Sequence, residues 1–327
     1  MKPVYWCADC ETALAEAEIE YHDKVSPSIY VKFPVTEGKG IIPDGSAIII
    51  WTTTPWTLPA NVAVCLHPEF TYVVVKVKDQ KYVLAKELLD NVAAQLGWSD
   101  YQIVTEFTGQ QIDRAVCRHP FIDRDSLVIM GEHVTLEAGT GCVHTAPGHG
   151  EDDFYVGKIY GLEVISPVDD RGVFTDEAGQ FAGLYVHKAN QKIIAAMDEL
   201  GVLLKADDYS HQYPHCWRCK NPIVYRATNQ WFASIDGFRH ATLEAIDNVR
   251  WIPSWGRERI YNMVRDRGDW CISRQRTWGV PIPIFYCGEC GEPVINPDII
   301  NHVSDLFCKF GSDIWFAKPA QELLPEG

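Results

Sequence analysis

The sequence contains no apolar run that approaches the roughly 18 residues needed for a membrane-spanning helix. Its first seven residues, MKPVYWC, have no apolar core of the kind found in secretory signal peptides. Internal repeats and low-complexity tracts are also lacking. From these absences we expect a cytoplasmic protein with no membrane partner. The length of 327 residues leaves room for two or more domains.

The sequence is also poor in basic charge, with 29 lysines and arginines, 44 acidic residues and a net charge of −15. A protein that binds nucleic acid over its whole surface needs the opposite balance, because its cations must neutralise phosphates. The charge is uneven, however, since residues 250–280 hold seven arginines and three acids. A local basic patch can therefore exist in this acidic chain, although a solvated helix face explains the same arginines.

Short β-prone runs dominate residues 26–208, and turn-forming pieces such as 43–45 (PDG) and 170–172 (DRG) separate them. The clearest of these runs are 48–51, 71–77, 82–85, 102–107 and 127–130. Apolar residues at helical spacing predict helices over 86–96 and 188–200, and further helices are expected around 241–246 and 257–265. Many strands with few helices predict a mixed α/β fold whose main part is a β-barrel-like domain with peripheral helices.

Eleven cysteines are present, and six of them form Cys-x-x-Cys pairs. This usage favours reduced thiols and zinc in the cytosol over a disulfide framework. Two knuckles, Cys7 with Cys10 and Cys216 with Cys219, would complete one tetrahedral structural zinc site. Because roughly 200 residues separate the pairs, a whole domain must be inserted between them, and the zinc would clip its two connecting strands together. The alternative is two unrelated surface turns with free thiols.

The segment 51–61 (WTTTPWTLPAN) follows an apolar run, 47–50, that is typical of a buried strand. Pro55 and Pro59 fix φ and remove backbone donors, so this segment should leave the sheet and hold one shape. Its hydroxyls would form a polar rim suited to an oxygen-rich substrate such as a ribose ester. The alternative is a threonine-rich strand and turn, because threonine favours strands in any case.

The segment 139–153 (GTGCVHTAPGHGEDD) contains four glycines, which let the backbone approach a ligand closely. Asp152 and Asp153 open a predicted helix that ends near residue 160, where the helix dipole favours carboxylates. By itself the segment fits a metal site or a capped helix equally. Together with residues 51–61 it closely resembles the editing domain of isoleucyl-tRNA synthetase. The valyl and leucyl enzymes usually carry an arginine where this chain has Thr54.

This resemblance implies hydrolysis of an aminoacyl ester on the terminal adenosine of tRNA. The expected partners are the acceptor 3′ end of tRNA(Ile) and a small amino acid ester. The expected substrate is the valine ester, because a hydrophobic pocket made for isoleucine cannot strongly reject valine and a second site must remove it.

Each site residue receives an expected role from the same resemblance. Asp153 would bind the α-ammonium group, and His144 would wall the side-chain pocket against isoleucine. Three hydroxyls would bind the ester and ribose and position the attacking water: Thr52, Thr53 and Thr54. The further substrate-binding candidates are Trp51, Asn61 and Gly141. Water positioning and electrostatic stabilisation are favoured over a side-chain nucleophile.

Two rival interpretations remain open at this level. A zinc hydrolase would use His144, His149 and Asp153 as ligands, although the glycines and Pro147 forbid the single helix that such sites use. A non-catalytic, zinc-clipped tRNA-binding module would keep the zinc and lose the chemistry. Otherwise His149 and Asp152 are expected only to pack and to cap the helix.

The resemblance also implies a domain layout, with the editing domain inserted through a zinc-clipped arm into a Rossmann-type catalytic domain of which only part is present. The expected segments are an outgoing zinc arm, the editing domain, a returning arm, part of the Rossmann domain and the start of a second zinc-knuckle segment: 1–25, 26–208, 209–235, 236–286 and 287–327. The His-x-Gly-His and Lys-Met-Ser-Lys-Ser loops of the family occur nowhere in the sequence. ATP and Mg²⁺ would therefore serve a parent enzyme only.

The last cysteine pair, Cys287 and Cys290, lacks a visible partner pair, and Cys308 is a lone candidate for a third ligand. Any zinc at this second knuckle should be weak or absent. Three residues of the preceding segment are expected near the synthetic site of the parent enzyme: Arg274, Gln275 and Trp278.

Overall fold

The computed structural model describes residues 1–325, which fall into two compact units. The first unit comprises residues 1–272, and the second begins at Ser273. Both motif segments and the first four knuckle cysteines lie in the first unit. Among the described residues, no helix combines the length and apolar character required to cross a bilayer.

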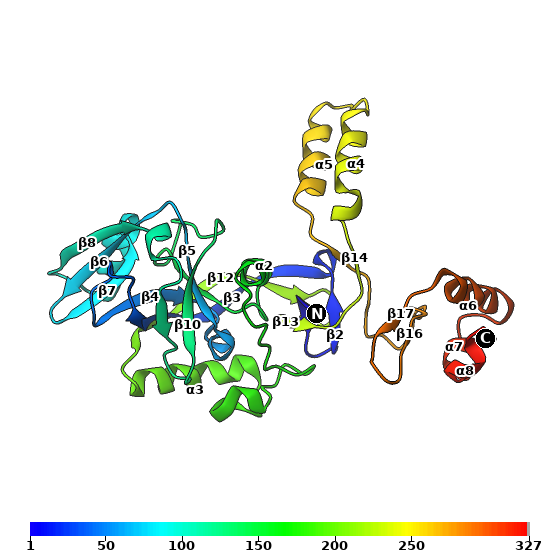
Figure 1. The fold of residues 1–327 in the computed structure, drawn as a ribbon, viewed down its shortest axis with the longest axis horizontal. Helices are drawn as coiled ribbons and strands as arrows, with labels where there is room; N and C mark the ends of the chain where they lie inside the picture. The colour runs from blue at the N-terminus through cyan, green and yellow to red at the C-terminus, as the bar shows by residue number, and fades with distance from the viewer. Residues whose placement is uncertain (326–327) are drawn as a thin grey trace. The chain divides into compact units, whose positions relative to one another are not determined.

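A ten-stranded mixed sheet forms the body of the first unit (Figure 1). Its hydrogen-bonded path runs β11-β5-β10-β9-β3-β4-β7-β6-β8, and β12 pairs with β3 outside this path. The strands are β3 (Ile19–Glu37), β4 (Ser46–Thr52), β5 (Ala63–Leu66), β6 (Thr71–Val77), β7 (Gln80–Ala85), β8 (Gln102–Thr108), β9 (Val116–Arg118), β10 (Asp125–Met130), β11 (Cys142–Thr145) and β12 (Leu203–Cys216). The large mixed sheet and its helices confirm the mixed α/β class.

The centre of this sheet is apolar, which explains why the run 47–50 forms a strand. Ile48, Ile49 and Ile50 are fully buried, because β4 lies between β3 and β7 and both of its faces are covered. The sheet curls so that β11 packs against β4. Within residues 1–325 no backbone pairing joins β11 to β8, so the barrel-like sheet is open in its hydrogen bonds.

A long two-stranded ribbon carries the chain from the sheet to the first four knuckle cysteines (Figure 1). It is made by β3 and β12, which pair antiparallel from Val31 opposite Leu203 to Ile19 opposite Cys216. Beyond it lies a small sheet of order β13-β1-β2, with β1 (Lys2–Cys7), β2 (Thr12–Leu14) and β13 (Val224–Thr228). The domain boundaries expected at residues 25 and 208 both fall within this continuous ribbon.

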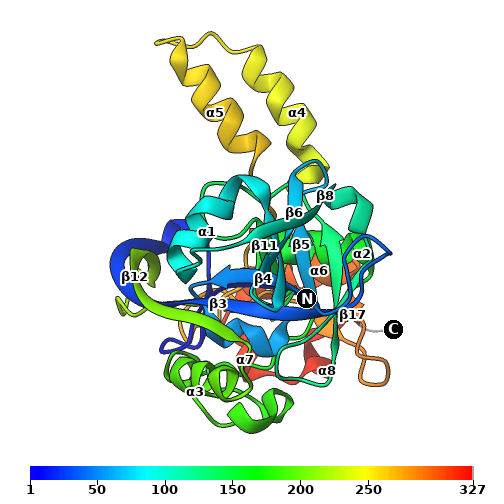
Figure 2. The ribbon, with the colours of Figure 1, turned by 90° about the vertical axis from the view of Figure 1, so that its left-hand side faces the viewer.

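Five α-helices lie in the first unit: α1 (Leu89–Leu96), α2 (Glu151–Tyr160), α3 (Val186–Glu199), α4 (Asp236–Asp247) and α5 (Trp255–Arg265). The helix α3 packs against β12 and against the 3-10 helix η2 (Pro55–Ala60). Figure 2 shows α3 next to β12. Its residues Ile193 and Met197 are fully buried, which confirms the expected apolar face. Leu200, the last apolar residue of the predicted range 188–200, instead follows the helix and is 58% exposed.

The sequence-predicted strands and helices of the first unit are confirmed with shifts of a few residues at their ends. The run 71–77 matches β6, whereas the helix predicted from residue 153 begins two residues earlier at Glu151. Two short strands, β14 (Phe232–Ala233) and β15 (Trp270–Cys271), pair with each other. The helices α4 and α5 lie between them in the sequence.

The second unit contains one short hairpin and three helices among its described residues. The hairpin is formed by β16 (Phe285–Tyr286) and β17 (Pro293–Val294), and the helices are α6 (Pro297–Phe310), α7 (Ile314–Ala317) and α8 (Ala320–Leu323). Trp278, in the segment before the hairpin, is 93% exposed.

Candidate active site

The end of β4, the start of η2 and the loop between β11 and α2 enclose a cavity of about 230 Å³, which we call the main cavity. Five of the sequence-predicted site residues line it: Trp51, Thr52, Thr54, His144 and Asp153. Four further residues complete its wall: Thr57, Val143, Ala146 and His149. The two motif segments, about 90 residues apart in the sequence, therefore form one site.

The threonine rim is held in one shape by its own hydrogen bonds. The strand β4 ends at Thr52, and Pro55 occupies the start of η2, which confirms that the segment leaves the sheet. The Thr54 N–H donates to Thr52 Oγ1 over 3.1 Å, and the two hydroxyl oxygens lie 3.2 Å apart. The Thr57 hydroxyl donates to the Thr54 carbonyl over 2.9 Å. These contacts order the rim before any substrate binds.

His144 is bound through both ring nitrogens. The Asn61 Nδ2 group donates to the Ala63 carbonyl over 2.7 Å and lies 2.8 Å from His144 Nδ1. Because a carbonyl can only accept, its contact identifies the amide nitrogen of Asn61, so Nδ1 of His144 is an acceptor. The proton of the neutral ring is then on Nε2, which donates to Thr57 Oγ1 over 2.8 Å.

The electrostatics of His144 follow from this burial. Burial lowers the pKa of the His144 imidazole to about 3, so the ring is neutral at physiological pH. Its lone pair is already used by Asn61 and its N–H by Thr57. A ring in this state offers no free base to a water molecule, and the geometry suits a rigid wall.

Asp153 supplies a half-buried carboxylate in the first turn of α2. Its Oδ2 accepts the backbone N–H of Ala146 over 2.8 Å. Burial raises the pKa of Asp153 to about 6, while this N–H opposes the shift, so the group is mostly ionised at neutral pH. No lysine or arginine of residues 1–325 forms an ion pair with it. The main cavity therefore contains a carboxylate without a lysine or arginine partner, and the imidazole of His133 is the nearby basic group that opposes the rise in its pKa.

His149 contributes a free lone pair that sequence reasoning did not anticipate. Its Nδ1 lies 2.7 Å from the Tyr225 carbonyl, so Nδ1 carries the proton and Nε2 is an acceptor. The ring packs edge-on against Trp56, which confirms the expected packing. Nε2 is buried and has no hydrogen-bond partner within the described chain. Burial lowers the pKa of His149 to about 4, which leaves the lone pair available at neutral pH.

Three predicted residues lie outside the main cavity. Thr53 lines a neighbouring cavity, and Asn61 is fully buried behind His144, where the Ser126 hydroxyl donates to its Oδ1 over 2.7 Å. Gly141 packs against the sheet, since a Cβ added there would lie 2.4 Å from the Ala85 Cβ. Of the residues that the prediction missed, Thr57 has the plainest sequence signal, because it lies in the same threonine-rich segment.

The four knuckle cysteines converge at the end of the ribbon. The sulfur atoms of Cys7, Cys10, Cys216 and Cys219 all lie within 4.8 Å of one another. The sulfurs of a tetrahedral zinc site are about 3.8 Å apart, given Zn–S bonds of about 2.3 Å, so the cluster fits a metal ion. It is the only group of three or more candidate ligands that converges in residues 1–325. His144, His149 and Asp153 form no such group, which leaves the zinc-hydrolase alternative without support.

The second knuckle, Cys287 with Cys290, forms a turn like that of a metal site, but no further candidate ligands converge on it in the described residues. Backbone N–H groups of Cys290 and Glu289 donate to the Cys287 sulfur and lower the pKa of its thiol. Cys308 lies on the exposed side of α6 and does not join a converging group in the described residues.

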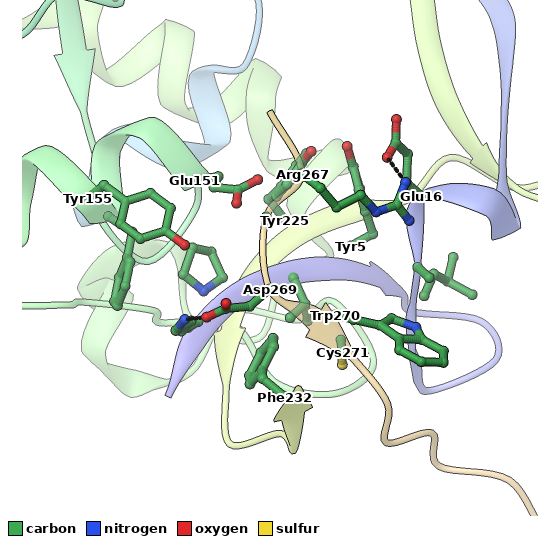
Figure 3. Close-up of a pocket in the computed structure, with 17 residues that line it drawn as sticks. Tyr5, Glu16, Glu151, Tyr155, Tyr225, Phe232, Arg267, Asp269, Trp270 and Cys271 are labelled. Carbon is green, nitrogen blue, oxygen red and sulfur yellow. Dashed lines mark hydrogen bonds and ion pairs between the residues drawn. The ribbon is translucent and has the colours of Figure 1, made fainter. Parts of the chain in front are cut away.

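A separate cavity of about 140 Å³ lies where β1, α2, β13 and the segment 267–271 meet (Figure 3). Ion pairs border it, with Lys2 bound to Asp269 and Arg267 3.4 Å from Glu16. In Figure 3 the labelled rings of Tyr155, Phe232 and Trp270 lie around Asp269. None of the sequence-predicted site residues lines this cavity. The candidate active site is therefore the main cavity.

Comparison with known proteins assigns the chain to a family. Residues 1–327 match the model of tRNA synthetases class I (I, L, M and V). The chain belongs to this family. It is 68% identical over 327 residues to an isoleucine–tRNA ligase of Syntrophomonas wolfei and 62% identical over 326 residues to one of Desulforamulus reducens. These alignments cover 100% and 99% of this chain and 35% of each relative.

The resemblance indicated by the two motif segments is thus confirmed at the level of the family, and the chain spans about a third of the length of these relatives. Among solved structures, "The crystal structure of GlLeuRS-CP1" matches with a TM-score of 0.44 and 16% identity. That match covers 55% of this chain and 98% of the other.

Proposed function

We propose that the main cavity hydrolyses the ester between a small amino acid and the terminal adenosine of tRNA(Ile), with the valine ester as the preferred substrate. The observation that carries this proposal is the pair formed by Asp153 and His144. One is a carboxylate without a lysine or arginine partner, and the other is a neutral, fully bonded imidazole in the same cavity wall.

Asp153 recognises what every aminoacyl ester shares. An α-ammonium group that enters the main cavity forms a charge-assisted hydrogen bond with this carboxylate. The backbone N–H of Ala146 occupies Oδ2 of the carboxylate and fixes its orientation. The contact is independent of the amino acid side chain, so it anchors the substrate without selecting it.

His144 then selects by size. Two hydrogen bonds hold its ring, so it cannot move aside at low cost when a larger side chain arrives. Discrimination by one methylene is weak in a pocket that only attracts, whereas a rigid wall excludes the larger side chain. The isoleucine enzyme is itself the established example of this double-sieve arrangement.

The chemical step uses ordered polar groups and a water molecule. The lone pair on His149 Nε2 accepts a hydrogen bond from the water and turns the water oxygen toward the ester carbonyl. Hydroxyls of Thr52 and Thr54 bind the ribose and donate to the oxygen that gains charge in the tetrahedral intermediate. The ribose hydroxyl leaves with a proton that originates from the attacking water.

We also propose that zinc fills the four-cysteine cluster and holds the two strands of the ribbon together. Zinc here is structural, because four thiolates complete its coordination and leave no open position. The expected inserted domain, its arm and the partial Rossmann domain belong to the same proposal. In a parent synthetase, ATP and Mg²⁺ would serve ligation at a separate site, and the setting would be cytoplasmic.

The role of Asp153 predicts a loss of hydrolysis for all substrates. Asp153→Asn should lower the rate toward both Val-tRNA and Ile-tRNA by roughly ten- to a hundredfold, because a charge-assisted hydrogen bond contributes about 1.5–3 kcal/mol. The wild-type rate should fall as pH drops through about 6, where Asp153 gains its proton. Steady-state deacylation between pH 5 and 8 measures both effects.

Asp152→Asn is the matched control, since that neighbouring carboxylate does not line the main cavity. A wild-type profile that stays flat through pH 6, or an Asp153→Asn protein with full activity, would contradict the ammonium assignment.

The role of His144 predicts a change of specificity. His144→Ala should open the pocket, so that Ile-tRNA is hydrolysed while hydrolysis of Val-tRNA persists. Rates on the two charged tRNAs measure the ratio, and circular dichroism checks that the variant is folded. A folded His144→Ala protein that is inactive toward both substrates would show that the histidine takes part in the chemistry.

The zinc proposal predicts a local effect. Cys216→Ser should release about one equivalent of metal and loosen the arm, because structural zinc contributes folding free energy directly. The buried knuckle cysteines pack with Leu14 and Ile223 in a small cluster separate from the main core, so the large sheet should remain folded. Metal analysis and thermal unfolding measure the two effects, with the exposed Cys308→Ser as control. Loss of the whole first unit on removal of zinc would overturn the division between arm and inserted domain.

A further inference from the structure

A second cavity, of about 110 Å³, adjoins the main cavity, and we call it the side cavity. The rim residue Thr54 lines both cavities, whereas Thr52 lines only the main cavity and Thr53 only the side cavity. The polar and aromatic lining of the side cavity comes largely from β3, η2, α3 and β12. It includes Lys24, Ser26, Trp56, His187 and Tyr213. No aspartate or glutamate lines it.

Lys24 brings a positive charge to the side cavity. Its ammonium lies 3.9 Å from the centre of the Tyr213 ring. Burial lowers the pKa of Lys24 to about 8, so it still carries its charge at neutral pH. No carboxylate in the part of the chain that the structure describes forms an ion pair with Lys24. A half-buried cation without a counter-ion is unfavourable unless an anion joins it.

Two buried polar atoms of the side-cavity residues also lack partners within residues 1–325. They are Nε1 of Trp56, which can only donate, and Nε2 of His187. Burial, with the nearby charge of Lys24 as a smaller cause, lowers the pKa of His187 to about 3 and keeps its ring neutral. Ser26 and Thr53 add two hydroxyl groups to the lining, and the Ser26 hydroxyl oxygen lies 3.0 Å from His211 Nε2. The side cavity thus combines a cation with polar groups and has no acidic residue in its lining, which suits an anion. This local balance is opposite to that of the whole chain, whose net charge is −15.

We propose that the side cavity binds the 5′-phosphate of the terminal nucleotide whose aminoacyl ester occupies the main cavity. This inference rests on the proposed function and adds a second contact point to it. The ribose lies against the shared residue Thr54, with the ester on one side and the phosphate on the other. Because Thr54 lines both cavities, a ribose against this residue lies next to each of them.

The test compares two small substrates that differ only in the phosphate: the valyl ester of adenosine and the valyl ester of adenosine 5′-monophosphate. The wild-type chain should show a KM roughly ten- to a hundredfold lower for the phosphorylated ester, with similar kcat, because a charge-assisted contact is added. Lys24→Met should remove this preference and leave the kinetics on the unphosphorylated ester unchanged. Lys24→Arg should retain much of it.

Lys32→Met is the matched control, because Lys32 lies on the same strand, β3, and does not line the side cavity. A wild-type chain that treats both esters alike would overturn the proposal. An equal loss on both esters in Lys24→Met would also overturn it, since Lys24 would then act on folding or on the aminoacyl group.

Binding of adenosine, AMP and inorganic phosphate, measured by calorimetry, separates this inference from the proposed function. Lys24-dependent binding of AMP without hydrolysis of either ester would support the phosphate site and contradict the deacylase. Hydrolysis of both esters at equal rates would support the deacylase and contradict the phosphate site. Inorganic phosphate that binds as tightly as AMP would indicate a free anion and overturn the nucleotide assignment.

Discussion

Asn61 fixes the ring of His144, and the arrangement of the main cavity depends on that contact. The Ser126 hydroxyl donates to the Asn61 amide oxygen, the amide nitrogen donates to His144 Nδ1, and His144 Nε2–H donates to Thr57. Every member of this buried chain is satisfied, which makes such a network rigid and specific. Removal of Asn61 would leave a buried nitrogen lone pair and a hydroxyl without partners, at a cost of about 1–3 kcal/mol for each.

In the proposed reaction, the work of the site is divided among groups that do not interfere with one another. His144 would contribute shape without charge, and Asp153 would contribute charge without contact to the amino acid side chain. His149, whose proton is held by the Tyr225 carbonyl, provides the free acceptor that His144 lacks. In the proposed reaction, selection, anchoring and water orientation therefore depend on three different residues. The side cavity, with Lys24, would add a contact to the nucleotide.

Sequence patterns predicted the strands that bury one or both faces, such as β4 and β6, because burial leaves a clear apolar pattern. The spacing of the cysteine pairs predicted two connecting strands, but the length of the ribbon of β3 and β12 was not predicted, since its exposed residues pair mainly with each other and carry no such pattern. The rim threonines, His144 and Asp153 were found because they lie in two compact motifs. The acceptor on His149 could not be found, because its tautomer depends on a carbonyl 76 residues away in the sequence.

The proton positions on the two histidines are the most direct test of this account. Nitrogen-15 NMR of the histidine-labelled chain, recorded between pH 5 and 8, reports which ring nitrogen carries the proton, and His144→Ala and His149→Ala spectra assign the signals. We expect both rings to be neutral throughout, with the proton on Nε2 of His144 and on Nδ1 of His149. A His144 ring that titrates in this range, or that carries its proton on Nδ1, would contradict the wall and make His144 a candidate base.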